Sequence, residues 1–128
     1  MGLFSGASKG TASAELKKLH GEYMQLLIDG EIIENGFAVN RDTFLFTNRR
    51  LILVNIQGLS GRKIEYLSIP YKKITKFSIE TGASFDLDAE LMIWIAGETM
   101  PIEKKFNKDV NIYDFQKVLA SHVLNTAS

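Results

Sequence analysis

The chain has 128 residues, and 45% of them are hydrophobic, so it is long enough for one domain whose core needs neither disulfides nor metals. Its 15 basic residues balance 15 acidic residues, which argues against a nucleic-acid-binding protein, because that class needs a net positive charge or a basic stripe. The absence of cysteine excludes disulfides and thiolate metal sites.

Residues 1–11 are mostly small and are predicted to be flexible, and residues 12–128 are predicted to form a single domain. No segment has the ~20 apolar residues of a membrane-spanning helix. No positively charged lead precedes an apolar core, as it does in a secretory signal. We therefore expect a cytoplasmic protein.

A first helix is predicted over residues 12–28. Its apolar residues recur at intervals of three and four and form one stripe, which consists of Leu16, Leu19, Tyr23 and Leu26. Gly30 suits the left-handed residue that commonly follows the end of a helix.

Residues 36–106 change to the patterns of β-strands. We expect seven strands separated by turn residues, with the sequences FAVNR, TFLFT, RLILVN, RKIEYLSI, TKFSIET, FDLDAELMIWI and TMPIEKKF. The third strand is apolar on both faces, which predicts burial on both sides. The sixth strand alternates: Phe85, Leu87, Ala89 and Leu91 are expected to point inward, and Asp86, Asp88 and Glu90 outward.

The hairpin between the fifth and sixth strands has a predicted register. A three-residue loop over residues 82–84 pairs Thr81 with Phe85. On the outer face this register sets Lys76 opposite Glu90, which is an attractive cross-strand pair.

A second helix is predicted over residues 111–124, with Asn111 as its N-cap. Its apolar stripe consists of Ile112, Phe115, Leu119 and either His122 or Val123. The order of helix, seven strands and helix predicts an α+β fold that is mainly β.

Residues 41–79 carry three motifs that resemble the bacterial pleckstrin-homology-like (PH-like) family of single-domain proteins. The motifs are TNRR at residues 47–50, QGLSG at residues 57–61 and IPY at residues 69–71. The resemblance implies a seven-stranded antiparallel barrel or sandwich with an N-terminal helix and a C-terminal capping helix. It also implies no known enzymatic activity and assembly into a dome-shaped cyclic ring, five-fold by analogy, whose polar surface binds other proteins.

Lipid binding is weakly indicated. A phosphoinositide headgroup needs several fixed cations around the loop between the first two strands, and this loop has only Arg41 beside Asp42. Other basic residues lie at strand ends, where they keep turns solvated: Arg49, Arg50, Arg62, Lys63, Lys72 and Lys73. Weak contact with an anionic membrane is possible at ~1 kcal/mol per cation, although no exposed apolar anchor loop is expected. Arg50 is expected to pair with Asp42 or with a backbone carbonyl.

The titratable residues show no sequence pattern that indicates an enzyme. Asp86, Asp88 and Glu90 form a carboxylate row, but no further ligand lies nearby in sequence to complete a calcium shell. His20 and His122 lie on different predicted helices, and His122 is expected to be packed rather than catalytic. We therefore expect no enzyme, cofactor or metal, and we interpret the row as a solvated face or as part of a surface that a partner contacts.

Met92 and Trp94 share the outward parity of the acidic row, so either the first helix or another subunit must cover them. With the resemblance, we favour the subunit contact and name Met92 and Trp94 as candidate self-association residues. The candidate partner surface consists of Lys76, Asp86, Asp88, Glu90, Arg62 and Lys63. The expected function is a binding module whose cyclic homo-oligomer repeats a weak site for a protein partner, and the alternative is a peripheral module on anionic phospholipid without phosphoinositide specificity.

Overall fold

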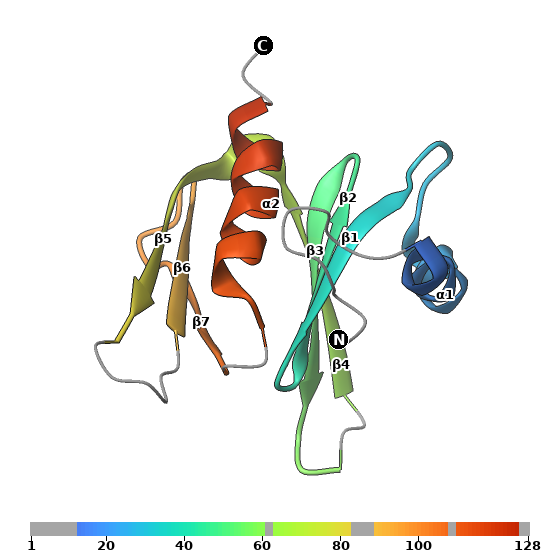
Figure 1. The fold of residues 1–128 in the computed structure, drawn as a ribbon, viewed down its shortest axis with the longest axis horizontal. Coiled ribbons are helices and arrows are strands. Elements are labelled where there is room, and N and C mark those ends of the chain that lie inside the picture. The colour runs from blue at the N-terminus through green and yellow to red at the C-terminus, as the bar shows by residue number, and fades with distance from the viewer. Residues whose placement is uncertain (1–12, 61–62, 83–88, 108–109, 126–128) are drawn as a thin grey trace.

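Two antiparallel sheets face each other, and the C-terminal helix fills the space between them at one open end (Figure 1). The structure is a computed structural model that describes residues 13–60, 63–82, 89–107 and 110–125. One sheet contains β1 (Ile33–Val39), β2 (Asp42–Thr47), β3 (Arg50–Gln57) and β4 (Lys63–Pro70) in that order. The other contains β5 (Ile74–Thr81), β6 (Ala89–Ile95) and β7 (Ile102–Phe106). The helices are α1 (Ser13–Tyr23) and α2 (Ile112–Leu124), with short 3-10 helices η2 (Met24–Leu26) and η3 (Tyr71–Lys73). The predicted fold class and all seven strands are confirmed.

Helix α2 forms where the sequence predicts it. The side chain of Asn111 accepts hydrogen bonds from the backbone N–H groups of Tyr113 and Asp114, as an N-cap residue does. Phe115 and Leu119 on its inner face are fully buried. The ring of Phe115 lies 4.7–5.5 Å, centroid to centroid, from four other rings, which belong to Phe37, Phe44, Phe46 and Phe106. This aromatic cluster fixes α2 against both sheets.

Strand β3 is buried on both faces, as its sequence predicts. Leu51 and Leu53 point into the space between the sheets, whereas Ile52 and Val54 point to the opposite side. There they pack with Leu19 of α1, and Leu16, Tyr23 and Leu26 border the same cluster. Helix α1 therefore covers the outside of the four-stranded sheet (Figure 1), and the possibility that it covers Met92 and Trp94 of β6 is wrong.

The first helix is shorter than predicted. It ends at Tyr23, continues as η2 to Leu26, and becomes extended at Leu27, where φ is −87° and ψ is 140°. Tertiary contacts outweigh helix propensity here, because the carbonyl of Leu26 accepts a hydrogen bond from Arg50. Gly30, with φ of +81°, then turns the chain into β1, which begins at Ile33 and not at residue 37.

The predicted register of the β5–β6 hairpin is wrong. Thr81 pairs with Ala89 and not with Phe85, so residues 82–88, and not residues 82–84, separate these two paired residues in the sequence. Lys76 consequently lies opposite Trp94, and Glu90 lies between Glu80 of β5 and Lys105 of β7. The shift is an even number of residues, so it leaves every side chain of β6 on its predicted face. The predicted positions of Phe85 and Leu87 lie outside the described residues.

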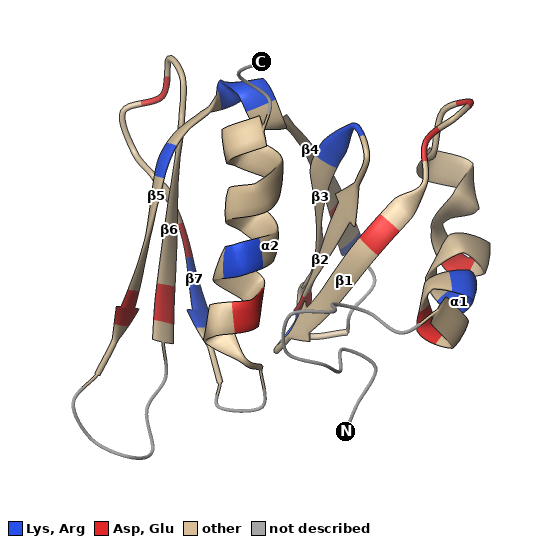
Figure 2. Ribbon diagram, turned by 45° about the horizontal axis from the view of Figure 1, so that its top comes forward, with Lys and Arg blue, Asp and Glu red and all other residues tan. Residues whose placement is uncertain are grey.

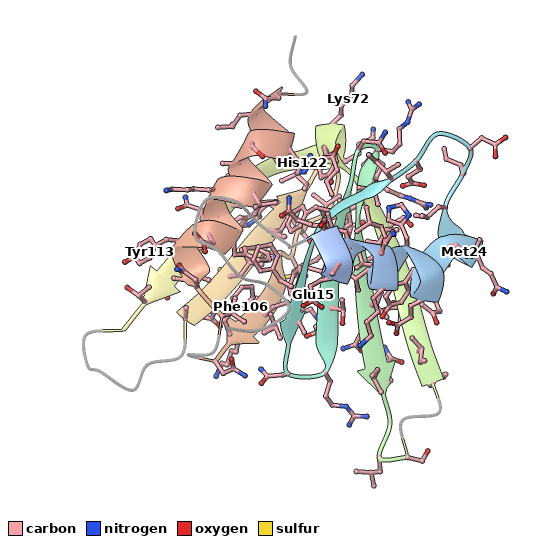
Figure 3. All side chains as sticks on the ribbon, turned by 45° about the vertical axis from the view of Figure 1, so that its right-hand side comes forward. Glu15, Met24, Lys72, Phe106, Tyr113 and His122 are labelled. Atoms are coloured by element: carbon pink, nitrogen blue, oxygen red, sulfur yellow. The ribbon has the colours of Figure 1, made fainter. Side chains whose placement is uncertain are left out.

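We predict that Phe115→Ala lowers the free energy of unfolding by about 3–5 kcal/mol, because it empties the centre of the aromatic cluster. Tyr113→Ala is the matched control, since Tyr113 points outward from the same helix (Figure 3) and is 67% exposed. Its expected effect is within about 0.5 kcal/mol. Urea unfolding followed by circular dichroism measures both values, and equal stabilities of the two variants would contradict this packing.

Candidate functional site

A buried ion pair joins the segment after α1 to the turn between β2 and β3. The side chain of Glu31 is fully buried and accepts hydrogen bonds from Arg50 Nε at 2.9 Å, Arg50 Nη2 at 2.9 Å and Thr47 Oγ1 at 2.6 Å. Arg50 also donates to the carbonyl of Leu26, which confirms one of its two predicted partners. The other, Asp42, is wrong, because Asp42 contacts Asn55 and Lys104 instead.

Two further motif residues extend this network, which we call the corner network and define as Glu31, Thr47, Asn48, Arg50 and Tyr71. Asn48 donates to the carbonyl of Gly30 and accepts from the N–H of Ile32, both across the turn. The hydroxyl of Tyr71 donates to the carbonyl of Thr47 at 2.7 Å. The TNRR and IPY motifs therefore have a structural role, because they bind the β2–β3 turn to the chain as it leaves β4.

The corner network sets the protonation of its members. Burial alone raises the pKa of Glu31, but the hydrogen bonds from Arg50 and Thr47 outweigh it and lower that pKa to about 2. Burial raises the pKa of Tyr71, and the charges of Glu34 and Glu31 raise it further. At neutral pH Glu31 is therefore ionised and Tyr71 keeps its proton.

The outward side of β5, β6 and β7, which we call the outer face, carries four of the predicted site residues. Met92 and Trp94 are half-buried on its middle strand, β6, and Lys76 Nζ lies 4.7 Å from the centroid of the Trp94 ring, which is a cation–π contact. Charged residues of both signs flank them on all three strands (Figure 2), namely Glu80, Glu90, Glu103 and Lys105. The arrangement is an apolar pair on the middle strand with a charged border, which consists of Lys76 beside Trp94 and of the other four residues towards Glu90.

The remaining predicted site residues are not brought to this face by the described part of the chain. Lys63 is the first residue of β4, in the other sheet. Asp86, Asp88 and Arg62 lie outside the described residues. Among the residues that the structure describes, no three His, Cys, Asp or Glu side chains form a group that could hold a metal ion. Within the same ranges, no helix has both the length and the apolar character needed to cross a membrane.

An exposed apolar tip contradicts the expectation that no loop could anchor in a membrane. Leu59 is fully exposed at the end of the β3–β4 hairpin, after Gly58, whose φ is +81°. Arg41 Nη2 donates to the carbonyl of Gly58 at 2.7 Å, and Lys63 begins the next strand. The sequence contained a signal for this exposed tip, because Leu59 lies between turn residues and a side chain at the tip of a hairpin cannot be buried.

Comparisons with known proteins agree with this fold. A family model described as "Bacterial PH domain" matches residues 2–123. The uncharacterized protein YjqA of Bacillus subtilis is 46% identical over 122 residues, which cover 94% of this chain and 98% of YjqA. A crystal structure of a pleckstrin homology domain from Shewanella amazonensis is 41% identical, with a TM-score of 0.79, and covers 85% of this chain and 98% of that one. A pleckstrin-homology-domain protein from Shewanella loihica is 42% identical with a TM-score of 0.76, over 84% and 92% of the two chains.

We predict that Glu31→Gln destabilises the protein at pH 7 by about 2–4 kcal/mol, because it leaves the partly buried Arg50 without its counter-charge. The folded-state pKa of Glu31 is lowered, so its contribution of roughly 3 kcal/mol is present above about pH 4.5 and is lost as the pH falls towards 2. Urea unfolding between pH 7 and pH 2.5 measures this change. Glu103→Gln, at an exposed glutamate, is the control, and its stability should change with pH as that of the wild type does. If Glu31→Gln lost stability in acid as steeply as the wild type, the lowered pKa of Glu31 would be contradicted.

Proposed function

Because the chain belongs to the bacterial PH domain family, we propose that it is a cytoplasmic, non-enzymatic binding module that assembles into a cyclic homo-oligomer and presents a repeated polar surface to a protein partner. The outer face is the observation that carries this proposal. Trp94, the only tryptophan in the chain, lies there beside Met92 with charged residues around them. Aromatic residues and methionine are enriched in the centres of protein interfaces, and charged residues at their borders.

The positions of the two helices support a contact between subunits at the outer face. Helix α2 packs on the inner side of the sheets and α1 on the outside of the other sheet, so both described helices lie elsewhere. Strands β5 and β7 end their sheet, and the edge of a sheet readily adds a strand or a surface from another chain. A second copy of the chain would cover Met92 and Trp94 and leave the charged border for a partner.

Multivalency supplies the mechanism in this proposal. A ring repeats one polar site in each subunit, so weak contacts act together once a partner spans two or more subunits. The charged residues of the outer face, Lys76, Glu80, Glu90 and Lys105, mix both signs and favour a partner whose surface is polar rather than strongly charged. Asp86 and Asp88 extend this candidate surface in sequence.

We predict that the wild type elutes as a defined multiple of its 14.4 kDa subunit mass and that Trp94→Ala dissociates it. Truncating a central interface tryptophan costs about 2 kcal/mol, which is about a 30-fold rise in the dissociation constant. Size-exclusion chromatography with light scattering measures both masses, with Tyr113→Ala on α2 as the aromatic control. A wild type that is monomeric at micromolar concentration, or an oligomer indifferent to Trp94→Ala, would overturn the proposed assembly.

The second candidate function is contact with anionic phospholipid, and the exposed Leu59 beside Arg41 and Lys63 is the observation that favours it. An apolar tip with neighbouring cations is the arrangement that a membrane surface attracts. Sedimentation with phosphatidylserine-containing vesicles separates the two functions. The protein module predicts no pelleting at physiological salt, whereas salt-sensitive pelleting that Leu59→Glu abolishes and Leu124→Glu retains would establish the membrane module instead.

A further inference from the structure

A polar cavity of about 450 Å³ opens where the C-terminal end of α2 meets β1 and the β2–β3 turn. Its lining includes Glu34, Asn48, Tyr71, His122 and Asn125 and, in the part of the chain described, neither lysine nor arginine. The volume lies within the range of small-ligand sites. This cavity is separate from the outer face, because it is built by the four-stranded sheet and α2.

His122 points from the last turns of α2 towards the four-stranded sheet (Figure 3). Its ring is nearly parallel to the rings of Tyr71 and Phe46, with centroid distances of 4.6 Å and 5.6 Å. His122 is therefore packed, as the sequence predicted. Its Nε2 atom lies 3.5 Å from Glu34 Oε1, which is long for a hydrogen bond. Burial lowers the pKa of His122, and the opposing effect of Glu34 is smaller, so the imidazole is neutral at neutral pH.

The formal charge of the cavity therefore comes from Glu34 alone among the described lining residues. Its side chain is 39% exposed and accessible to a ligand. The neutral imidazole does not neutralise this carboxylate. The other polar lining groups are amides and hydroxyls, whose oxygens have two lone pairs each and can accept a second hydrogen bond beside one made within the fold. A cavity with one carboxylate, several acceptors and no cation favours a ligand that is positively charged and carries several N–H donors.

The walls are held in place before any ligand binds. Asn48 uses its amide for hydrogen bonds to Gly30 and Ile32, and Tyr71 uses its hydroxyl for the bond to Thr47. Both belong to the corner network, so the rigid part of the fold forms two sides of the cavity. Preorganised walls lower the entropy lost on binding.

We propose that this cavity binds the guanidinium group of an arginine side chain presented by a protein partner. The planar guanidinium donates to both oxygens of a carboxylate at once, which suits Glu34, and its remaining N–H groups suit the amide oxygens of the lining. A lysine ammonium is a compact point charge that fills such a site less completely. The identity of the ligand as a partner's arginine rests on the proposed function, whereas its charge and shape follow from the cavity.

The test is an NMR titration of the ¹⁵N-labelled full chain with N-acetyl-arginine-amide. We expect saturable shifts at Glu34, Asn48 and His122, with a dissociation constant on the order of millimolar for one isolated residue. The citrulline analogue has nearly the same shape without the charge and should bind at least about ten-fold more weakly. Glu34→Gln should weaken arginine binding to a similar extent, and Glu98→Gln, at an exposed glutamate beside β7, should leave it unchanged.

Each contrary outcome has a separate meaning. Equal binding of the citrulline and arginine analogues, or full binding by Glu34→Gln, overturns the guanidinium site. Binding of the lysine analogue as tight as that of arginine overturns the preference for a planar cation. Shifts with agmatine but none with N-acetyl-arginine-amide overturn the partner's arginine and assign the cavity to a small free cation. The oligomer mass of Glu34→Gln should equal that of the wild type, so failure of the assembly and failure of this site are distinguishable.

Discussion

The hydrogen bonds between Glu31, Arg50 and Thr47 are the interaction on which the rest of the structure depends. A fully buried carboxylate is stable only when its partners surround it, and here three donors from the β2–β3 turn do so. The same turn accepts the hydroxyl of Tyr71, at the point where the chain passes from one sheet to the other. This corner therefore holds the segment after α1 through Leu26, joins the two sheets through Tyr71, and supplies Asn48 and Tyr71 to the walls of the cavity beside His122.

The sequence predicted the elements well and their partners less well. The double burial of β3, the cap at Asn111 and the outward parity of Met92 and Trp94 follow from periodicity, which is a local property. The β5–β6 register was missed because a shift by an even number of residues leaves the pattern unchanged. The charged partner of Arg50 was missed because Glu31 belongs to another segment, and two charges distant in sequence show no pattern that links them.

For the candidate sites too, local patterns predicted some features, and contacts between distant segments determined the others. Parity alone was enough to set Met92 and Trp94 on one face, because a strand has only two faces. The pairing of Glu34 with His122 needed the packing of α2 against β1, which no local pattern contains. The outer face, the cavity and the Leu59 tip use different elements, so each can be tested by substitutions that leave the other two intact.

The most direct test of assembly through the outer face uses the fact that Trp94 is the only tryptophan. Its fluorescence reports on this face alone, without a label. We predict that dilution from micromolar to nanomolar concentration shifts the emission to longer wavelength and makes the indole more accessible to acrylamide. The reason is that an indole covered by a second subunit returns to its half-buried state when the subunits separate. An emission spectrum and a quenching constant that do not change with concentration would contradict the account.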